Sequence, residues 1–286
     1  MPTPMPAEVI EAQRKDWNRV AGGWDKWDQY FSRNMTFINH RLAADARLRP
    51  GMQVLDVGSG TGYPALLAGE VVGSDGSVVG IDLAESMLAV ATRKAQALGM
   101  KHVTFRTGDA TALPFDGESF DAVISRFCLM FLPEIPKALK DMARVLKPGG
   151  YMAAAVWSSP DTNPFMRIPM DVIKSIVTLP TPDPEAPGVF RLAKSGELTG
   201  MLKGAGLARL SEEEFLADVT YTTAEEFFSS LMDIAAPFQN LFATLTPQQK
   251  SEAERGIITA VNRFRRHDRI VLPIAARVVA ARKPER

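Results

Sequence analysis

The chain has 286 residues, enough to bury one large hydrophobic core without disulfides or a metal ion. Lys and Arg together number 33, as do Asp and Glu, so no global charge attracts the protein to nucleic acid or to an anionic surface. Hydrophobic residues make up 46% and charged residues 23%, values typical of a globular protein. We expect one compact unit with elaborations, and no nucleic-acid partner.

The single cysteine, Cys128, excludes an intrachain disulfide and a cysteine-rich zinc site, and we expect no metal. It lies in the apolar stretch 127–131, which favours a buried thiol over a nucleophile. No apolar run in the sequence reaches membrane-spanning length, and the first residues lack both a basic start before an apolar run and a twin-arginine pair. These observations predict no membrane span and a cytoplasmic location.

The first predicted region, 1–50, is a helical lid. Residues 7–49 have a helical pattern with closely spaced aromatic residues, and Pro50 with Gly51 ends it. Ordinary helix packing explains most of these aromatics as well as ligand contact does. The residues singled out here as candidate lid contacts are Trp24, Trp27 and Tyr30.

His40 lies in the same segment and is the best candidate for a general base, against the alternative of a capping or surface histidine. The other two histidines, His102 and His267, are expected to be structural, because they lie before a predicted strand and in a charged turn.

From 51 to 158, short apolar runs alternate with amphipathic helical patterns. Strands without strict alternation, separated by such helices, predict a mostly parallel sheet covered on both faces. Ser86 is expected to cap a helix that begins at Met87, and Gly99 to end it. The predicted fold class is therefore α/β, with a Rossmann-like sheet and additional helical elements.

The pattern changes after this core. The Pro-rich stretch 159–194 predicts a lid or insertion. The region 195–286 predicts the rest of the sheet, with a helical insertion at about 223–265. The insertions suit either a lid or a dimer surface, and the sequence leaves a homodimer open.

The strongest local signal is the run VLDVGSGTG at 54–62, a strand that leads through three alternating glycines into a helix. Glycine lets the backbone turn sharply, and the following helix end presents free N–H groups to a ligand. In a dinucleotide fingerprint the third glycine would stand at Tyr63, and Asp56 would repel a pyrophosphate. A cationic ligand without phosphate fits better.

Two further acids follow the next two predicted strands. Asp82 ends one strand, where an acid commonly binds ribose hydroxyls, and Asp109 follows another, where it could accept a hydrogen bond from an adenine amino group. Each alone could be a turn or cap residue, but three acids at consecutive strand ends fit the ligand-binding edge of an open α/β sheet.

The runs VLDVGSGTG, VVGIDLAESML and the stretch 105–152 together closely resemble the class I S-adenosylmethionine-dependent methyltransferases, particularly the branch related to ubiquinone and menaquinone methyltransferases. The resemblance covers about 52–157 and implies seven strands, the last antiparallel. It also implies S-adenosylmethionine as cofactor.

The resemblance assigns the cofactor-binding residues. It implies that Asp56, Gly58, Gly60 and Gly62 hold the methionine end of the cofactor and that Arg126 lines this end. It also implies that Asp82 binds the ribose, that Met87 lies against one face of the adenine, and that Asp109 and Ala110 contact the adenine edge. Many relatives carry histidine after the fourth strand. Here apolar residues stand at 129–132, so the substrate pocket is expected to be apolar, with Phe131 a candidate substrate contact.

The expected function is methyl transfer to oxygen, nitrogen or carbon of a small, hydrophobic or aromatic acceptor by in-line displacement. Positioning supplies most of the rate in such a transfer, so an obvious base is not required. The alternative is a protein that binds S-adenosylmethionine for another reaction or for none. An NAD-dependent oxidoreductase is opposed by Asp56 and Tyr63.

Overall fold

The computed structural model describes residues 6–180, 183 and 185–285. Residues 1–5 of the predicted lid lie outside the described part. So do residues 181, 182 and 184 of the predicted insertion, and residue 286.

The chain begins with two long helices, α1 (Pro6–Lys26) and α2 (Asp28–Asp45), where the sequence predicted helical structure. The buried residues of α2 fall three or four apart, which is the spacing of one helix face. That face includes Met35, Ile38, Asn39 and Leu42. It packs on the sheet, whereas α1 packs on later helices.

The sheet is built from β1 (Gln53–Val57), β2 (Ser77–Asp82), β3 (Val103–Thr107), β4 (Phe120–Arg126), β5 (Leu146–Trp157), β6 (Ala208–Tyr221), β7 (Arg265–Arg266) and β8 (Arg269–Arg282). Its order is β3-β2-β1-β4-β5-β8-β6, with the two-residue β7 pairing on β8. Strands β1 to β5 pair in parallel, and β8 is antiparallel to both of its neighbours. The predicted Rossmann-like sheet, with its last strand antiparallel, is confirmed.

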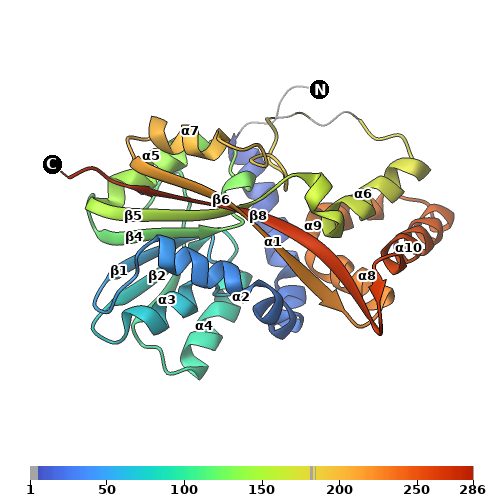
Figure 1. Ribbon diagram of the computed structural model, residues 1–286, viewed down its shortest axis with the longest axis horizontal. Coiled ribbons are helices and arrows are strands. Elements are labelled where there is room, and N and C mark those ends of the chain that lie inside the picture. The colour runs from blue at the N-terminus through green and yellow to red at the C-terminus, as the bar shows by residue number, and fades with distance from the viewer. Residues whose placement is uncertain (1–5, 181–182, 184, 286) are drawn as a thin grey trace.

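Helices cover both faces of the sheet. Figure 1 shows α2, α3 (Ala65–Val72) and α4 (Glu85–Ala97) on one side, and α5 (Ile135–Val145) and α7 (Glu197–Gly204) on the other. Because both faces are covered, β1 is buried at four consecutive positions, 54–57, and reads as an apolar run in the sequence.

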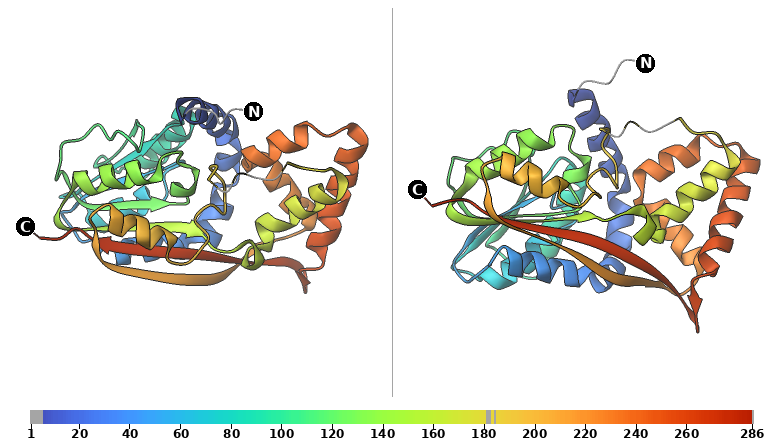
Figure 2. Two further views of the ribbon diagram at one scale, coloured as in Figure 1. Left: turned by 90° about the horizontal axis from the view of Figure 1, so that it is seen from above. Right: turned by 45° about the horizontal axis from the view of Figure 1, so that its top comes forward.

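A second group of helices lies beyond one end of the core sheet: α6 (Pro164–Ile176), α8 (Ala224–Ile234), α9 (Ala236–Ala243) and α10 (Pro247–Asn262). Figure 2 shows β6 and β8 extending from the core to this group, with α1 between the two parts. Helices α6, α8 and α10 contact one another and these strands. The two long strands therefore join the core to the helical group.

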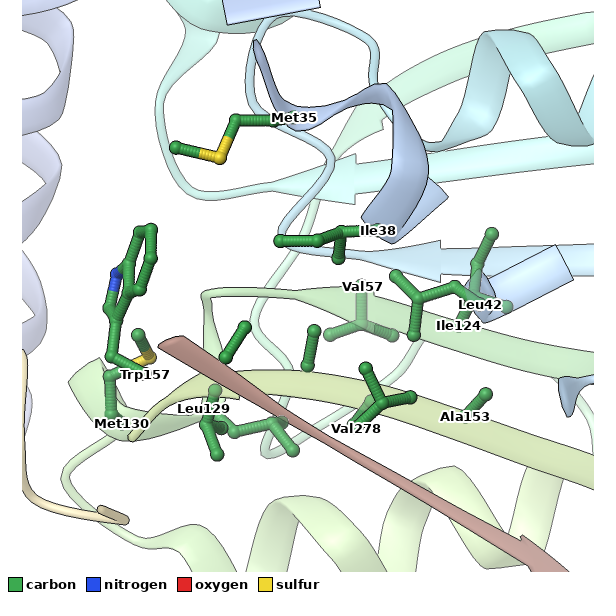
Figure 3. Close-up of a cluster of buried hydrophobic side chains, with 14 of the residues drawn as sticks. Met35, Ile38, Leu42, Val57, Ile124, Leu129, Met130, Ala153, Trp157 and Val278 are labelled. Atoms are coloured by element: carbon green, nitrogen blue, oxygen red, sulfur yellow. The ribbon is translucent and has the colours of Figure 1, made fainter. Parts of the chain in front are cut away.

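Apolar side chains from the sheet and α2 form one continuous core. Figure 3 shows Ile38 and Leu42 of α2 lying over Val57 and Ile124 of the central strands, and all four are almost fully buried. This packing fixes the ends of β1 and β4, where the functional residues follow.

Two local details differ from expectation. Helix α4 begins at Glu85, and its N-cap is Ala84 without a side-chain cap, because the Ser86 N–H donates instead to Asn18 Oδ1 at 2.8 Å. The predicted cap at Ser86 is therefore wrong. Gly99, with a φ of 69°, follows the end of the helix as expected.

Candidate functional site

A cavity lies at the carboxyl ends of the central strands, with an empty volume of about 1650 Å³ that includes its opening to solvent. Its walls come from helices α1, α2, α4, α6, α8 and α9 and from the segments that follow β1 to β5. Most lining residues are apolar, and among those that the structure describes, Asp82 and Arg126 carry formal charge. The site combines a polar rim at the strand ends with an extensive apolar wall.

The loop after β1 forms part of the polar rim. Gly58, Gly60 and Gly62 all have positive φ, of 74°, 50° and 109°. Gly58 and Gly60 line the cavity, whereas Gly62 packs against α3 and α4. Side chains are disfavoured at such φ values, so the backbone can approach a ligand closely here.

Asp82 lies at the end of β2 and faces the cavity. Its Oδ2 accepts a hydrogen bond from Gly60 N at 2.9 Å and its Oδ1 accepts one from Ala84 N at 3.0 Å. Burial raises the pKa of this carboxyl, and the backbone donors oppose that effect. A carboxylate held by two backbone groups is a rigid acceptor for a diol.

Asp56 is fully buried below the glycine loop and is not among the residues that line the cavity. Its Oδ2 accepts from Ala65 N at 3.1 Å, while Oδ1 has no hydrogen-bond partner. Burial raises its pKa to about 7, and the nearby guanidinium of Arg126 opposes that rise. The unpartnered oxygen fits a cationic ligand better than a phosphate.

Arg126 is the last residue of β4 and lines the cavity. Its Nη1 donates to Asn39 Oδ1 of α2 at 2.8 Å. Burial lowers the pKa of Arg126 to about 10, so the guanidinium remains charged at neutral pH. Sequence reasoning missed Asn39, which could have been found from the helical spacing of Met35, Ile38 and Leu42.

Met87 and Ala110 line the cavity near the ends of β2 and β3. Met87 is buried in a small apolar cluster with Ala84 and α1. Asp109 is not a lining residue, and its Oδ1 accepts from Thr111 N at 2.8 Å, which stabilises the turn after β3. Six of the nine predicted cofactor residues therefore line one cavity; those that do not are Asp56, Gly62 and Asp109.

The predicted lid contacts divide into two pairs. Trp24 and Phe131 line the cavity. Trp27 and Tyr30 do not: Trp27 Nε1 donates to Asp233 Oδ2 at 2.8 Å, and Tyr30 stacks on Tyr221 with ring centroids 4.4 Å apart. The second pair contributes to packing between α2 and the later elements.

His40 is exposed on α2 and is not among the residues that line the cavity. The buried residues of α2 are Phe31, Met35, Ile38, Asn39 and Leu42, and His40 is not among them. The structure thus does not support His40 as a general base. Cys128 does line the cavity, and burial raises the pKa of its thiol, so it remains protonated.

Sequence reasoning also missed much of the apolar wall. The missed Phe127 and Trp157 stack with ring centroids 3.9 Å apart, whereas the predicted Phe131 meets Trp17 edge to face at 5.4 Å. The other apolar lining residues missed include Phe31, Met35, Phe165, Met166, Val189, Leu231, Ile234 and Pro237. They come from segments far apart in the chain, so no local pattern marks them as one wall.

Comparisons with known proteins agree with this geometry. The family described as Methyltransferase domain matches residues 54–150. The demethylmenaquinone methyltransferase of Staphylococcus aureus is 41% identical over 163 residues, which cover 55% of this chain and 67% of that protein.

The chain belongs to the class I S-adenosylmethionine-dependent methyltransferases. Within them it falls in the branch related to menaquinone methyltransferases. S-adenosylmethionine is the cofactor of this family. Asp82 in the cavity lining fits a ribose diol, the glycine backbone lets a ligand approach closely, and the carboxyl of Asp56 lies buried behind that loop.

Solved structures of the methyltransferase fold cover more of the chain. The YcgJ protein of Bacillus subtilis aligns with a TM-score of 0.60 at 20% identity, covering 88% of this chain and all of that one. A second match is a Haemonchus contortus phosphoethanolamine N-methyltransferase in complex with phosphomonomethylethanolamine and S-adenosylhomocysteine. It aligns with a TM-score of 0.59 at 20% identity, and the alignment covers 100% of this chain and 62% of that one. Identities this low show the shared fold alone.

The chain spans about half to two thirds of the length of the curated relatives it matches. The acceptor of those methyltransferases therefore does not follow for this chain from similarity. No helix among the described residues has the length and apolar character needed to cross a membrane.

Proposed function

We propose that the protein transfers a methyl group from S-adenosylmethionine to a small, hydrophobic or aromatic acceptor. The observation that carries this proposal is the composition of the cavity lining, in which Gly58, Gly60 and Asp82 lie at or just after strand ends and most of the other residues are apolar. A neutral ring would bury itself against that wall, which contains Phe127 and Trp157.

In this proposal Asp82 holds the ribose hydroxyls, Met87 lies against the adenine, and the glycine loop approaches the methionine end. Asp109 and Gly62 support the site from behind it, because their contacts lie within the protein. When bound, the cofactor supplies an activated methyl group. The protein's main contribution is then to hold the acceptor in line with that group and to exclude water.

The helices that cover the carboxyl ends of the strands would exclude water from the cavity. Helix α1 contributes Gln13, Trp17 and Trp24 to the cavity wall, and Gln13 Nε2 donates to Phe131 O at 2.7 Å. Helices α8 and α9 contribute Leu231, Ile234 and Pro237. We propose that α1 and the helical group act as the lids that the sequence suggested.

The first test is calorimetric titration with S-adenosylmethionine and S-adenosylhomocysteine, with NADH as a control ligand. Asp82→Ala should weaken binding of both sulfur ligands by at least about tenfold, because the ribose loses a charged acceptor. Asp75→Ala, at an exposed turn, is the matched control and should bind like the wild type.

An acceptor screen follows on the protein that binds cofactor. Formation of methylated product together with S-adenosylhomocysteine from a neutral aromatic compound would support the proposal. Binding of neither sulfur ligand, or turnover of hydrophilic cations alone, would contradict it.

A further inference from the structure

The apolar wall of the cavity is interrupted by one cationic side chain, that of Arg126. Arg126 is the last residue of β4 and directly precedes Phe127, whose ring stacks on Trp157 in the wall. On its other side lies α2, which contributes Phe31 and Met35 to the same wall. Arg126 therefore lies where the polar rim meets the space for the acceptor.

The guanidinium is positioned but not neutralised. Asn39, which is 2% exposed, fixes it through one hydrogen bond to Nη1. Among the described residues no ion pair within 4.0 Å engages Arg126. Among the described residues, Asn39 is the hydrogen-bond partner of Arg126, at Nη1, so the remaining donors of this lining side chain are available to a ligand.

The charged and titratable groups near Arg126 have other roles. Asp28 of α2 pairs with Lys94, and Asp56 of β1 accepts from the backbone of α3. Tyr63, which precedes α3, also lines the cavity, and burial raises the pKa of its hydroxyl, which favours the neutral donor form. The Tyr63 side chain is hydrogen-bonded to that of Ser32, which leaves Arg126 as the charged donor among the described lining residues.

Among the described residues, the cavity lining also offers no unengaged proton acceptor for a neutral hydroxyl. His40 lies outside it, Asp82 is held by two backbone N–H groups, and Cys128 stays protonated. An acceptor that must lose a proton would therefore bind best if it had already lost it to solvent. A fixed cation in an apolar site strongly favours such an anion.

We propose that Arg126 selects the acceptor by binding its reacting group as an oxygen anion, the ionised hydroxyl of an aromatic ring. This inference rests on the proposed function and names the substrate class of the same site. The proton leaves to solvent before transfer. The oxygen lone pair then forms the bond to the methyl carbon, and the carbon–sulfur bond breaks with its electron pair going to sulfur.

The test uses 4-nitrophenol, because its absorbance distinguishes the phenol from the phenolate without turnover. The dye is titrated with pH in the presence of protein loaded with S-adenosylhomocysteine, and again with protein free of it. Wild-type protein should favour the bound phenolate by about tenfold or more, which appears as a lower apparent pKa of the dye.

Two variants separate charge from packing. Arg126→Met should abolish the preference for phenolate while weakening S-adenosylhomocysteine binding by a smaller factor. Arg126→Lys keeps the charge but not the planar geometry, and should retain part of the preference. Thermal melting of both variants with and without S-adenosylhomocysteine checks that they are folded.

Three results would overturn the inference. The first is an equal preference for phenolate in wild type and Arg126→Met, and the second is absence of phenolate binding to the wild type. The third is a loss of S-adenosylhomocysteine affinity in Arg126→Met as large as the loss of phenolate preference, since Arg126 would then bind the cofactor. A lack of methyl transfer would count against the proposed function and leave this equilibrium result intact.

Discussion

Gly58 shows how one residue can serve both packing and ligand access. It has a φ of 74°, and a Cβ built on it would lie 2.4 Å from both Cβ and Sγ of Cys128. Any side chain here would strain the backbone and also displace the segment after β4.

We expect Gly58→Ala to reduce the free energy of unfolding by about 3 kcal/mol, from backbone strain plus overpacking. Gly51→Ala is the matched control, because Gly51 has a φ of 82° but its Cβ would meet nothing within 4 Å. It should cost only about 1 kcal/mol. Urea denaturation measures both, and equal losses would contradict the role of Cys128.

Asp56 should make the stability of the cofactor-free protein depend on pH. Its pKa is raised from 3.8 to about 7 by burial, so the folded protein holds a proton that the unfolded chain releases over this range. Stability should therefore fall as pH rises from about 4 to 7, by an amount on the order of 4 kcal/mol, and level off above that.

Comparison of melting temperatures between pH 5 and 8 for wild type and Asp56→Asn measures this contribution. Other groups titrate in both proteins, so the difference between the two curves isolates Asp56. The variant should show the flatter curve. Parallel curves would mean that Asp56 is ionised throughout the range.

The polar half of the cavity could be predicted from sequence because its residues stand in one short motif and at consecutive strand ends. The apolar half could not be predicted in the same way. Its wall joins positions as distant as Trp17, Trp157 and Leu231, which come together only through the fold. The sequence also did not reveal that His40 would be exposed on α2, outside the residues that line the cavity.

At the scale of elements, α1 contacts α4 through a small buried apolar cluster and, toward its first half, through exposed polar groups. Asn18 Nδ2 donates to Glu85 Oε2 at 2.8 Å, Asn18 Oδ1 accepts from Ser86 N at 2.8 Å, and Arg14 pairs with Glu85 at 3.1 Å. Such contacts are individually weak, so this end of the cavity cover should open more readily than the core.

Asn18→Ala removes two of these contacts at once and should increase the dissociation rate of S-adenosylhomocysteine severalfold, with faster hydrogen exchange in α1. Lys15→Ala is the control, since Lys15 pairs only within α1, with Glu11 at 3.5 Å. Stopped-flow displacement measures the rates. An unchanged rate in Asn18→Ala would mean that α1 does not limit release.

At the scale of the molecule, Glu212 joins three distant parts of the chain. Its carboxylate accepts from Gly196 N at 2.9 Å and from Ser195 and Thr199 side chains, and it pairs with Arg277 at 3.0 Å. It thus connects the start of α7 to β6 and β8, the strands that extend to the helical group.

Glu212→Gln should lower the free energy of unfolding by about 2 kcal/mol at neutral pH, because Arg277 and the helix start lose a partly buried charge. The hydrogen bonds to Glu212 lower its pKa overall, against the effect of burial. Its contribution is therefore present above the unfolded pKa and is lost as pH falls through the folded one.

The measurement is urea denaturation at neutral and acid pH. Glu213→Gln serves as the matched control, because the Glu213 side chain is 56% exposed and should contribute little. The difference between Glu212→Gln and wild type should shrink toward acid pH. A constant difference would show that shape, not charge, makes the connection.

The position of β8 between β5 and β6 also has a consequence for biosynthesis. On the ribosome, the fourteen residues of β6 emerge well before the strand that will pair with them, and more than forty residues of helix and turn are made in between. Until β8 arrives, β6 has no partner on either edge and is open to pairing with another nascent chain. The exposed Glu213 and Glu214 along it then act as gatekeepers against aggregation during translation.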